Sequence, residues 1–338
     1  MKIAKRKIIL STILSVFIMT ELSIASFCLD KNENFTEKDQ NISIDRIYGE
    51  DRFDTSIKVS KFINTEDKLA KYIIIASGDI YPDALSAGVL AGEFNAPLLL
   101  VSSMKSNDKI YDYISKISDK EETSIFVVGG EKTISKNVEN EISKYGDVTR
   151  IFGKNRIETS QLIYEPILKK KGMLAIPDMA AVYSSYNYPD SLTATPFMFQ
   201  YNRDKKYDFM PFFSIDIKNQ TRTPDIVFGG KNSIPDLNEK IRVYGSDRYK
   251  TAVEIGKRYK TMLNKDIETI VLVSGEDFPD ALSASPLAIK ENAAILLTNS
   301  RYLNKDTKKY INSNKNIKKI IIVGGENSIT QKVEKDLK

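Results

Sequence analysis

The stretch Val271-Leu-Val-Ser-Gly-Glu-Asp-Phe-Pro-Asp-Ala-Leu-Ser-Ala-Ser-Pro-Leu-Ala288 decides the fold, because it reads as a strand, a polar turn and a helix start. Its apolar opening is typical of a strand covered on both faces. Proline is tolerated in the first helical turn, where the following aspartate complements the helix dipole. A close copy is Ile73-Ile-Ile-Ala-Ser-Gly-Asp-Ile-Tyr-Pro-Asp-Ala-Leu-Ser-Ala87, and a looser one is Ala181-Val-Tyr-Ser-Ser-Tyr-Asn-Tyr-Pro-Asp-Ser-Leu-Thr-Ala194.

Two further phrases accompany every copy in the same order. The upstream phrase has the form Arg-x-(Tyr/Phe)-Gly-x-(Asp/Asn)-Arg and begins at Arg46, Arg150 and Arg242. The downstream phrase carries a Gly-Gly pair after an apolar run, at residues 129–130, 229–230 and 324–325. Each round is about 100 residues long, which is the size of a small domain and not of a solenoid repeat. We expect repeats at residues 45–148, 149–239 and 240–338.

Strands and helices alternate within each repeat. In the first repeat, continuous apolar runs at residues 72–76, 96–101 and 124–128 predict buried strands. Parallel strands need crossover connections, which the intervening helices supply. The sequence therefore predicts an α/β fold of three tandem Rossmann-like units with mainly parallel sheets, packed on one another because the linkers are short. Pro196 and Pro286 predict a kink or a restart in the helix after the Pro-Asp pair.

The N-terminus is typical of an exported protein. Four cationic residues, Lys2 to Lys7, precede an apolar run at residues 8–19, and small residues follow up to Ala25. This pattern predicts a signal peptide at residues 1–25, and the run is short for a membrane span, so none is expected after cleavage. Phe27 does not suit the lipoprotein motif that Cys28 suggests. Residues 26–44 are polar and aperiodic, which predicts a flexible leader.

Composition excludes several classes of function. The 338 residues include no histidine, no tryptophan and one cysteine. A Ser-His-Asp or Cys-His catalytic pair, a zinc site with histidine or several cysteine ligands, and an internal disulfide are therefore excluded. We expect no catalytic residue, metal or cofactor. Loss of residues 1–25 removes four cationic side chains and Glu21, which lowers the formal net charge from +5 to +2. A chain so close to neutral is not a general nucleic-acid binder.

The second arginine of the upstream phrase is the strongest candidate for a binding residue. It recurs as Arg52, Arg156 and Arg248. A cation in the first turn of a helix is opposed by the helix dipole, so its recurrence implies a fixed partner. That partner is either the Pro-Asp aspartate of the same or an adjacent repeat, or an anionic ligand held through two hydrogen bonds. Both remain open at the level of the sequence.

The other repeated positions favour structural roles. The Gly-Gly pairs lack phosphate-loop spacing and predict tight β-to-α turns. The first arginines could cover a sheet edge. The Pro-Asp aspartates suit a structural role at a helix start, with ligand contact as the alternative. The aromatic residues beside these phrases are expected mainly in the core, although a loop tyrosine can stack on a sugar ring; they are Tyr48, Phe152, Tyr244, Tyr81, Tyr188 and Phe278.

Together the three phrases resemble the clostridial cell-wall-binding repeat family, type 2, over residues from about 43 to 338. The first and third repeats match its pattern almost letter for letter, and the second is looser. The resemblance implies a pseudo-threefold assembly of Rossmann-like units that holds a secreted protein on the Gram-positive cell wall or surface. The implied ligand is an anionic secondary cell wall polymer, and three linked sites would gain avidity.

Carried onto this sequence, the resemblance and the strand-end position of ligands in open α/β sheets give a set of candidate ligand residues. They are Arg52, Arg156, Arg248, Ser77, Ser184, Ser274, Asp83, Asp190 and Asp280. One alternative is an N-acetylmuramoyl-L-alanine amidase or its modifier, although a zinc amidase needs histidine ligands. Another is a surface-layer component with protein partners.

Overall fold

The computed structural model describes residues 41–64, 68–203, 209–220 and 222–338. The predicted signal peptide at residues 1–25 lies outside the described residues, and so does most of the predicted leader. From Ile42 onward the chain belongs to one compact unit. Strand β1 (Ser43–Ile47) begins inside the range predicted as leader, residues 26–44, so Ser43 and Ile44 belong to a strand and not to a leader. The reason is a contact from the far end of the chain, because the Ser43 amide donates to the Lys318 carbonyl at 2.9 Å.

The described residues form three four-stranded sheets, and every pair of neighbouring strands in them is parallel. The first sheet has the order β3-β2-β4-β5, with β2 (Tyr72–Ser77), β3 (Leu98–Val101), β4 (Ser124–Val128) and β5 (Asp147–Ile151). The second has the order β7-β6-β8-β9, with β6 (Ala181–Tyr183), β7 (Phe212–Ser214), β8 (Ile226–Phe228) and β9 (Ile241–Val243). The third has the order β11-β10-β12-β1, with β10 (Thr269–Ser274), β11 (Ala294–Thr298) and β12 (Lys319–Val323). The α/β fold class is confirmed.

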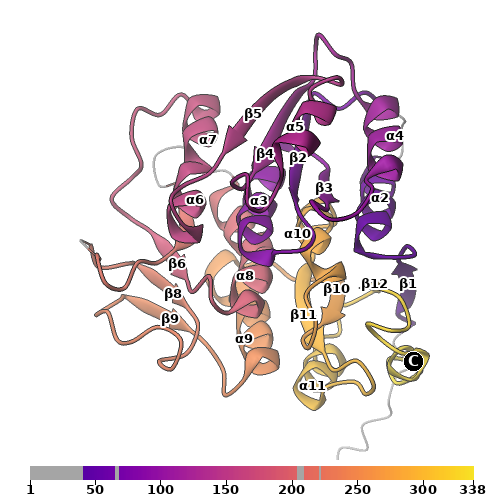
Figure 1. Cartoon of the computed structure of the whole chain (residues 1–338). Helices are drawn as coiled ribbons and strands as arrows, with labels where there is room; N and C mark the ends of the chain where they lie inside the picture. The colour runs from indigo at the N-terminus through magenta and orange to yellow at the C-terminus, as the bar shows by residue number, and fades with distance from the viewer. Residues whose placement is uncertain (1–40, 65–67, 204–208, 221) are drawn as a thin grey trace, which may run out of the picture. The chain divides into compact units, whose positions relative to one another are not determined.

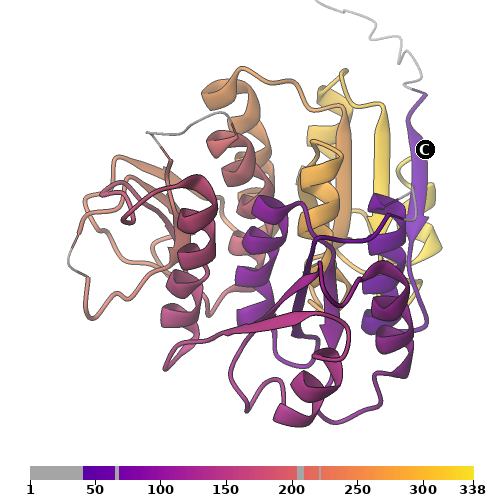
Figure 2. The same ribbon diagram turned by 90° about the horizontal axis from the view of Figure 1, so that it is seen from above.

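Each sheet takes its last strand from a different repeat. Strand β5 opens the second repeat but pairs with β4 of the first, and β9 opens the third repeat but pairs with β8 of the second. Strand β1 opens the first repeat and pairs with β12 near the C-terminus, with Ile47 opposite Val323. Figure 2 shows the indigo β1 beside the yellow strand. The first repeat therefore closes the third sheet.

The helices fall into equivalent sets. Helices α2 (Arg52–Ile63), α6 (Arg156–Leu162) and α9 (Arg248–Leu263) follow the arginine phrases. Helices α3 (Tyr81–Phe94) and α8 (Tyr188–Asn202) follow the Pro-Asp phrases, as does the 3-10 turn η1 (Asp280–Ser283) with α10 (Ala284–Lys290). The others are α4 (Asp108–Ile117), α5 (Lys136–Ile142), α7 (Tyr164–Lys171), α11 (Lys305–Ser313) and α12 (Gln331–Lys335). The restart expected before Pro286 is present between η1 and α10, whereas α8 continues through Pro196.

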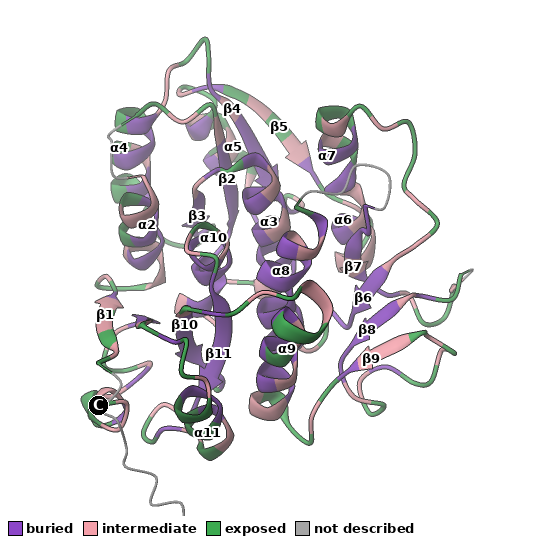
Figure 3. Cartoon of the chain, turned by 180° about the vertical axis from the view of Figure 1, so that it is seen from behind, coloured by how far each residue is buried: buried purple, intermediate pink, exposed green. Residues whose placement is uncertain are grey.

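Helices α3, α8 and α10 contact one another pairwise at the centre of the three units (Figure 1). The contact is close because the facing residues are small: a Cβ on Gly88 would lie 3.1 Å from the Ser285 Cβ and 4.0 Å from the Thr195 methyl carbon. These helices are among the most buried elements (Figure 3). Equal strand orders around three equivalent helices give the units a pseudo-threefold relation.

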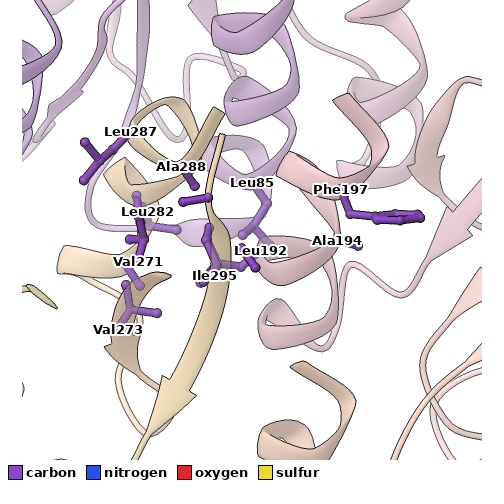
Figure 4. Packing of buried hydrophobic residues seen from close by; sticks show 14 of the residues in the cluster. Leu85, Leu192, Ala194, Phe197, Val271, Val273, Leu282, Leu287, Ala288 and Ile295 are labelled. Atoms are coloured by element: carbon purple, nitrogen blue, oxygen red, sulfur yellow. The ribbon is translucent and has the colours of Figure 1, made fainter. Parts of the chain in front are cut away.

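One hydrophobic cluster joins the three repeats at this centre. It includes Leu85 of α3, Leu192 of α8 and Ile295 of β11, which Figure 4 shows near one another. Each of these side chains is at least nine-tenths buried, and full burial of a leucine or isoleucine stabilises a fold by about 1.5–3 kcal/mol. The repeats therefore share this central cluster, and two smaller clusters lie within the first and the second repeat.

Candidate functional site

Three positions of the upstream phrase build the start of a helix. The amide of the phrase glycine donates to the hydroxyl of the threonine six residues later at 3.0 Å in all three repeats; the pairs are Gly49–Thr55, Gly153–Thr159 and Gly245–Thr251. The Asp/Asn of the phrase caps the helix, as when Asp51 accepts from the Phe53 and Asp54 amides. The glycine, the Asp/Asn and the threonine of the phrase therefore have a structural role at the start of the helix.

The first arginines hold the edge strands β1, β5 and β9 to the strand beside them in the same sheet. Arg150 forms an ion pair with Glu139 at 2.6 Å, and its Nη1 donates to the Gly129 carbonyl at 2.7 Å. Arg46 makes the equivalent bond to Gly324, and Arg242 to Gly229. Their strands lie at sheet edges, in agreement with the expected role of covering an edge.

The second arginines stand at the first residue of α2, α6 and α9. In each, Nη1 donates to a carbonyl in the turn after the Pro-Asp strand of the same repeat; the pairs are Arg52–Gly78 at 2.7 Å, Arg156–Ser185 at 3.3 Å and Arg248–Gly275. A main-chain carbonyl is thus one fixed partner, which sequence reasoning did not consider.

The second arginines also face the preceding repeat. Burial raises the pKa of Asp83 in the first repeat, and the positive charge of Arg156 acts against this increase. Arg248 has the same effect on the pKa of Asp190 in the second repeat. Arg248 lies 5.9 Å from the ring centre of Tyr188, and Arg52 lies 5.9 Å from that of Phe278. In the first two of these contacts the aspartate that senses the arginine charge belongs to the adjacent repeat, but no ion pair joins the two side chains in the described part of the chain.

The Pro-Asp aspartates lie under the Gly-Gly turns. Asp83 accepts from Thr133 at 3.5 Å, Asp190 from Asn187 at 2.8 Å and Asp280 from Ser328 at 2.6 Å. Burial raises the pKa of Asp83, and it raises that of Asp190 to about 6 against the Asn187 hydrogen bond and the Arg248 charge. Asp83 and Asp190 occupy the first turn of α3 and α8, and Asn187, which donates to Asp190, is the N-cap residue of α8.

The first glycine of each Gly-Gly pair explains why this turn needs glycine. Gly129, Gly229 and Gly324 have φ of 129°, 128° and 124°, a region that side chains disfavour. A Cβ on Gly129 would also lie 3.0 Å from the Asp83 Oδ2. The expected tight turn is present, with a carboxylate packed against it.

The serines predicted as ligand contacts are buried in their own turns. Ser77 accepts from the Asp79 and Ile80 amides at 3.2 Å, and Ser274 accepts from Glu276 and Asp277 at 3.2 and 3.3 Å. Ser184 accepts from the Tyr186 amide at 3.4 Å. Their hydroxyl groups shape the loops that carry the arginine-binding carbonyls, and direct contact of these serines with a ligand stays a prediction.

Three equivalent aromatic rings meet where the units converge. The ring centres of Tyr81, Tyr188 and Phe278 are 5.1 to 6.1 Å apart. The Tyr188 hydroxyl is buried with no hydrogen-bond partner in the described part of the chain. Burial raises the pKa of Tyr188 to about 12, although Arg248 opposes the rise.

The other aromatic set corrects a prediction. Tyr48, Phe152 and Tyr244 were expected mainly in the core, yet each is about half exposed. They follow the edge strands, which present them beyond the end of the sheet. Their repetition at a strand end was the signal that could have indicated exposure.

These contacts define three inter-repeat sites. Each combines a second arginine from one repeat with the Pro-Asp phrase and the Gly-Gly turn of the preceding repeat. The first contains Arg156 and Asp83, the second Arg248 and Asp190, and the third Arg52 and Phe278. The third site joins the N-terminal repeat to the C-terminal one. Chemically, each offers a guanidinium at the carboxyl ends of parallel strands, where open α/β sheets bind ligands.

The described residues contain neither a candidate metal site nor a candidate membrane-spanning helix. Within those ranges, no group of three or more His, Cys, Asp or Glu side chains is placed to hold a metal ion. None of the helices described is long and apolar enough to cross a membrane.

The chain belongs to the family described as Cell wall binding domain 2 (CWB2), as its repeated phrases predicted. Residues 46–139 and 242–334 match this family and together make up more than half of the chain. These ranges lie within the first and third repeats, and the sheet of the second repeat has the same strand order.

Two curated relatives come from Bacillus subtilis (strain 168). "N-acetylmuramoyl-L-alanine amidase LytC" is 27% identical over 306 residues, which cover 88% of this chain and 58% of the relative. "Amidase enhancer" is 29% identical over 306 residues, which cover 88% of this chain and 40% of the relative. The chain thus spans roughly half the length of these relatives.

Two solved structures share the fold. "Cwp8 from Clostridium difficile" has a TM-score of 0.71 at 24% identity, over 88% of this chain and 52% of its own. "Cwp6 from Clostridium difficile" has a TM-score of 0.71 at 20% identity, over 88% and 48%. At such identities the likeness concerns the architecture, and it agrees with three parallel-sheet units.

Proposed function

We propose that this chain is a non-catalytic anchor that binds an anionic secondary cell wall polymer through its three inter-repeat sites. The observation that carries the proposal is the second arginine. Each guanidinium donates from Nη1 to a turn carbonyl, and in the described part of the chain none of the three forms an ion pair with a carboxylate. A guanidinium suits a phosphate or carboxylate, which arginine binds through two parallel hydrogen bonds.

The arrangement of the sites favours a polymer over a small anion. Three equivalent arginines on one body can engage successive ionised groups of one chain. After the first contact the others are intramolecular, so three weak sites give strong binding. Membership of the Cell wall binding domain 2 family supports the wall as the location of the ligand. Export through the signal peptide predicted at residues 1–25 belongs to the same proposal.

An amidase, or a protein that modifies one, is the second candidate, because the two Bacillus relatives carry those names. The chain contains no histidine, which a zinc amidase uses to hold its metal. We therefore assign wall binding, and not hydrolysis, to these residues. A surface-layer role with protein partners is compatible with anchoring.

Co-sedimentation with two preparations of Gram-positive walls tests the proposal. One preparation is intact, and the other is acid-extracted so that it keeps peptidoglycan but loses its anionic polymers. We expect residues 26–338 to sediment only with the intact walls, and added salt should release the protein because the contacts are ionic. Equal binding to both preparations would point to peptidoglycan and favour the amidase-related candidate. No binding to either would direct the search to surface proteins.

A further inference from the structure

Each repeat presents one aromatic ring directly after its edge strand. The exposed fractions are 54% for Tyr48, 52% for Phe152 and 48% for Tyr244. A single exposed aromatic residue is ordinary in a folded protein. Here an aromatic ring recurs at the same position in all three repeats. It is present even in the second repeat, which departs from the common pattern elsewhere, for example at Ser185 in place of a turn glycine. Exposure of an aromatic side chain at the same position in three repeats favours contact with a ligand.

The ring lies against the second glycine of the Gly-Gly pair in the preceding unit. A Cβ built on that glycine would meet the Cδ2 of the ring at 3.6 to 3.7 Å; the pairs are Phe152–Gly130, Tyr244–Gly230 and Tyr48–Gly325. That separation is ordinary van der Waals contact, and no other neighbouring atom is that near. The second glycines do not adopt positive φ either. Alanine would fit the fold, so the fold does not explain the glycine.

The second glycine also offers hydrogen-bonding capacity. The Gly130 carbonyl accepts from the Thr133 and Ile134 amides. By contrast, the hydrogen bonds found among the described residues do not use the amide N–H of Gly130, Gly230 or Gly325. All three glycines are partly exposed. An unpaired donor thus lies beside a half-exposed ring, with no side chain between them.

We infer that Tyr48, Phe152 and Tyr244, each with the second glycine beside it, form three platforms on which sugar rings of a wall glycan stack. The C–H face of a sugar packs against the negative face of an aromatic ring. Sugar hydroxyl groups can accept from the glycine amide. A Cβ on the glycine would narrow the space next to the ring, which is why glycine recurs there.

The platforms stand next to the proposed anion sites, so the inference rests on the proposed function and deepens it. In every repeat the aromatic residue precedes the second arginine by four residues, as Tyr48 precedes Arg52. The ligand class is therefore a glycan whose ionised groups alternate with sugar rings that have an accessible C–H face. A linear polyanion without sugar rings would engage the arginines alone.

Alanine substitution of the rings tests the platforms on intact, polymer-bearing walls. Each of Tyr48→Ala, Phe152→Ala and Tyr244→Ala should weaken binding about fivefold, the loss of one aromatic contact. The salt dependence of binding should stay unchanged, because no charge is removed. Tyr302→Ala is the matched control, since Tyr302 is 56% exposed but lies outside the repeated phrases.

A second set of variants keeps the test decisive if a ring variant fails to fold. Gly130→Ala, Gly230→Ala and Gly325→Ala should melt like the parent protein and still bind walls several-fold more weakly. If the parent protein sediments with intact walls and both sets bind as well as Tyr302→Ala, the platforms are refuted while polymer anchoring stands. If the parent protein itself does not bind intact walls, the proposed function fails first.

Discussion

Arg46 and Glu334 form an ion pair between the first and the last repeat, with Nη2 3.0 Å from Oε2. Nη1 of the same arginine donates to the Gly324 and Ile329 carbonyls. These bonds hold β1 to the third sheet, and the third inter-repeat site lies beside them. The two ends of the described chain are thereby needed for one site.

Arg46→Ala should lower the free energy of unfolding by about 2 kcal/mol, because three largely buried acceptors lose a charged donor. Amide hydrogen exchange in β12 should accelerate more than in β4, since the edge that β1 covers is opened. Lys58→Ala, at an exposed position of α2, serves as the control. Equal melting of the two variants would mean that β1 contributes little to the third sheet.

Gly129→Ala should destabilise the fold by at least about 2 kcal/mol, because positive φ disfavours a side chain. The new Cβ would also lie 2.5 Å from the Thr133 Oγ1. Gly130→Ala, one residue on, should cost almost nothing. Urea unfolding of both variants measures the contrast, and similar losses would show that the two glycines share one structural role.

Asp190 should make stability depend on pH in a defined direction. Its pKa is raised to about 6 in the folded protein from 3.8, chiefly by burial. The folded state thus binds the proton more tightly between about pH 4 and pH 6, so this group's contribution to stability increases as pH falls through that range. Relative to Asp190→Asn, the parent protein should gain about 2 kcal/mol between pH 7.5 and pH 4.5, and the rest of the gain should come only below pH 4.5.

Urea unfolding of both proteins at several pH values measures that difference. The comparison removes the pH dependence that comes from carboxylates present in both proteins. Glu239 is one of these: burial raises its pKa, but the ion pair with Arg242 lowers it overall. A difference that does not change with pH would show that Asp190 titrates normally.

Tyr188→Phe should be neutral or slightly stabilising, within about 1 kcal/mol, because the buried hydroxyl lacks a partner. Phe278 already occupies the equivalent position of the third repeat. Thermal unfolding provides the measurement, with Tyr81→Phe as the companion variant. A clear loss of stability would reveal a hydrogen bond to the Tyr188 hydroxyl.

Local patterns were sufficient to predict most of the fold. The apolar run at residues 124–128 became β4 with the same bounds, and the runs at residues 72–76 and 96–101 contain most of β2 and all of β3. Such features depend on neighbours in the chain, which hydrophobic patterning reports directly.

The partners across repeats were beyond sequence reasoning. Three similar copies of a strand offer equally good edges, so nothing in the residues of β1 selects β12 over β4. For the same reason the partner of Arg156 could be narrowed to an aspartate or a ligand, but the carbonyl of Ser185 was not foreseen. A turn serine such as Ser77 can bind a ligand or its own backbone, and the sequence does not show that its side chain is buried.

The most direct test of the central claim is the wall-binding affinity of Arg52→Ala, Arg156→Ala and Arg248→Ala, singly and combined. The control replaces three exposed helix lysines, Lys58, Lys116 and Lys309, by alanine, so that the change in charge is the same. We predict that the folded triple arginine variant binds intact walls at least about 100-fold more weakly, because avidity is lost, whereas the lysine variant binds nearly as well as the parent protein. A folded triple arginine variant that binds like the lysine variant would contradict three arginine-centred sites.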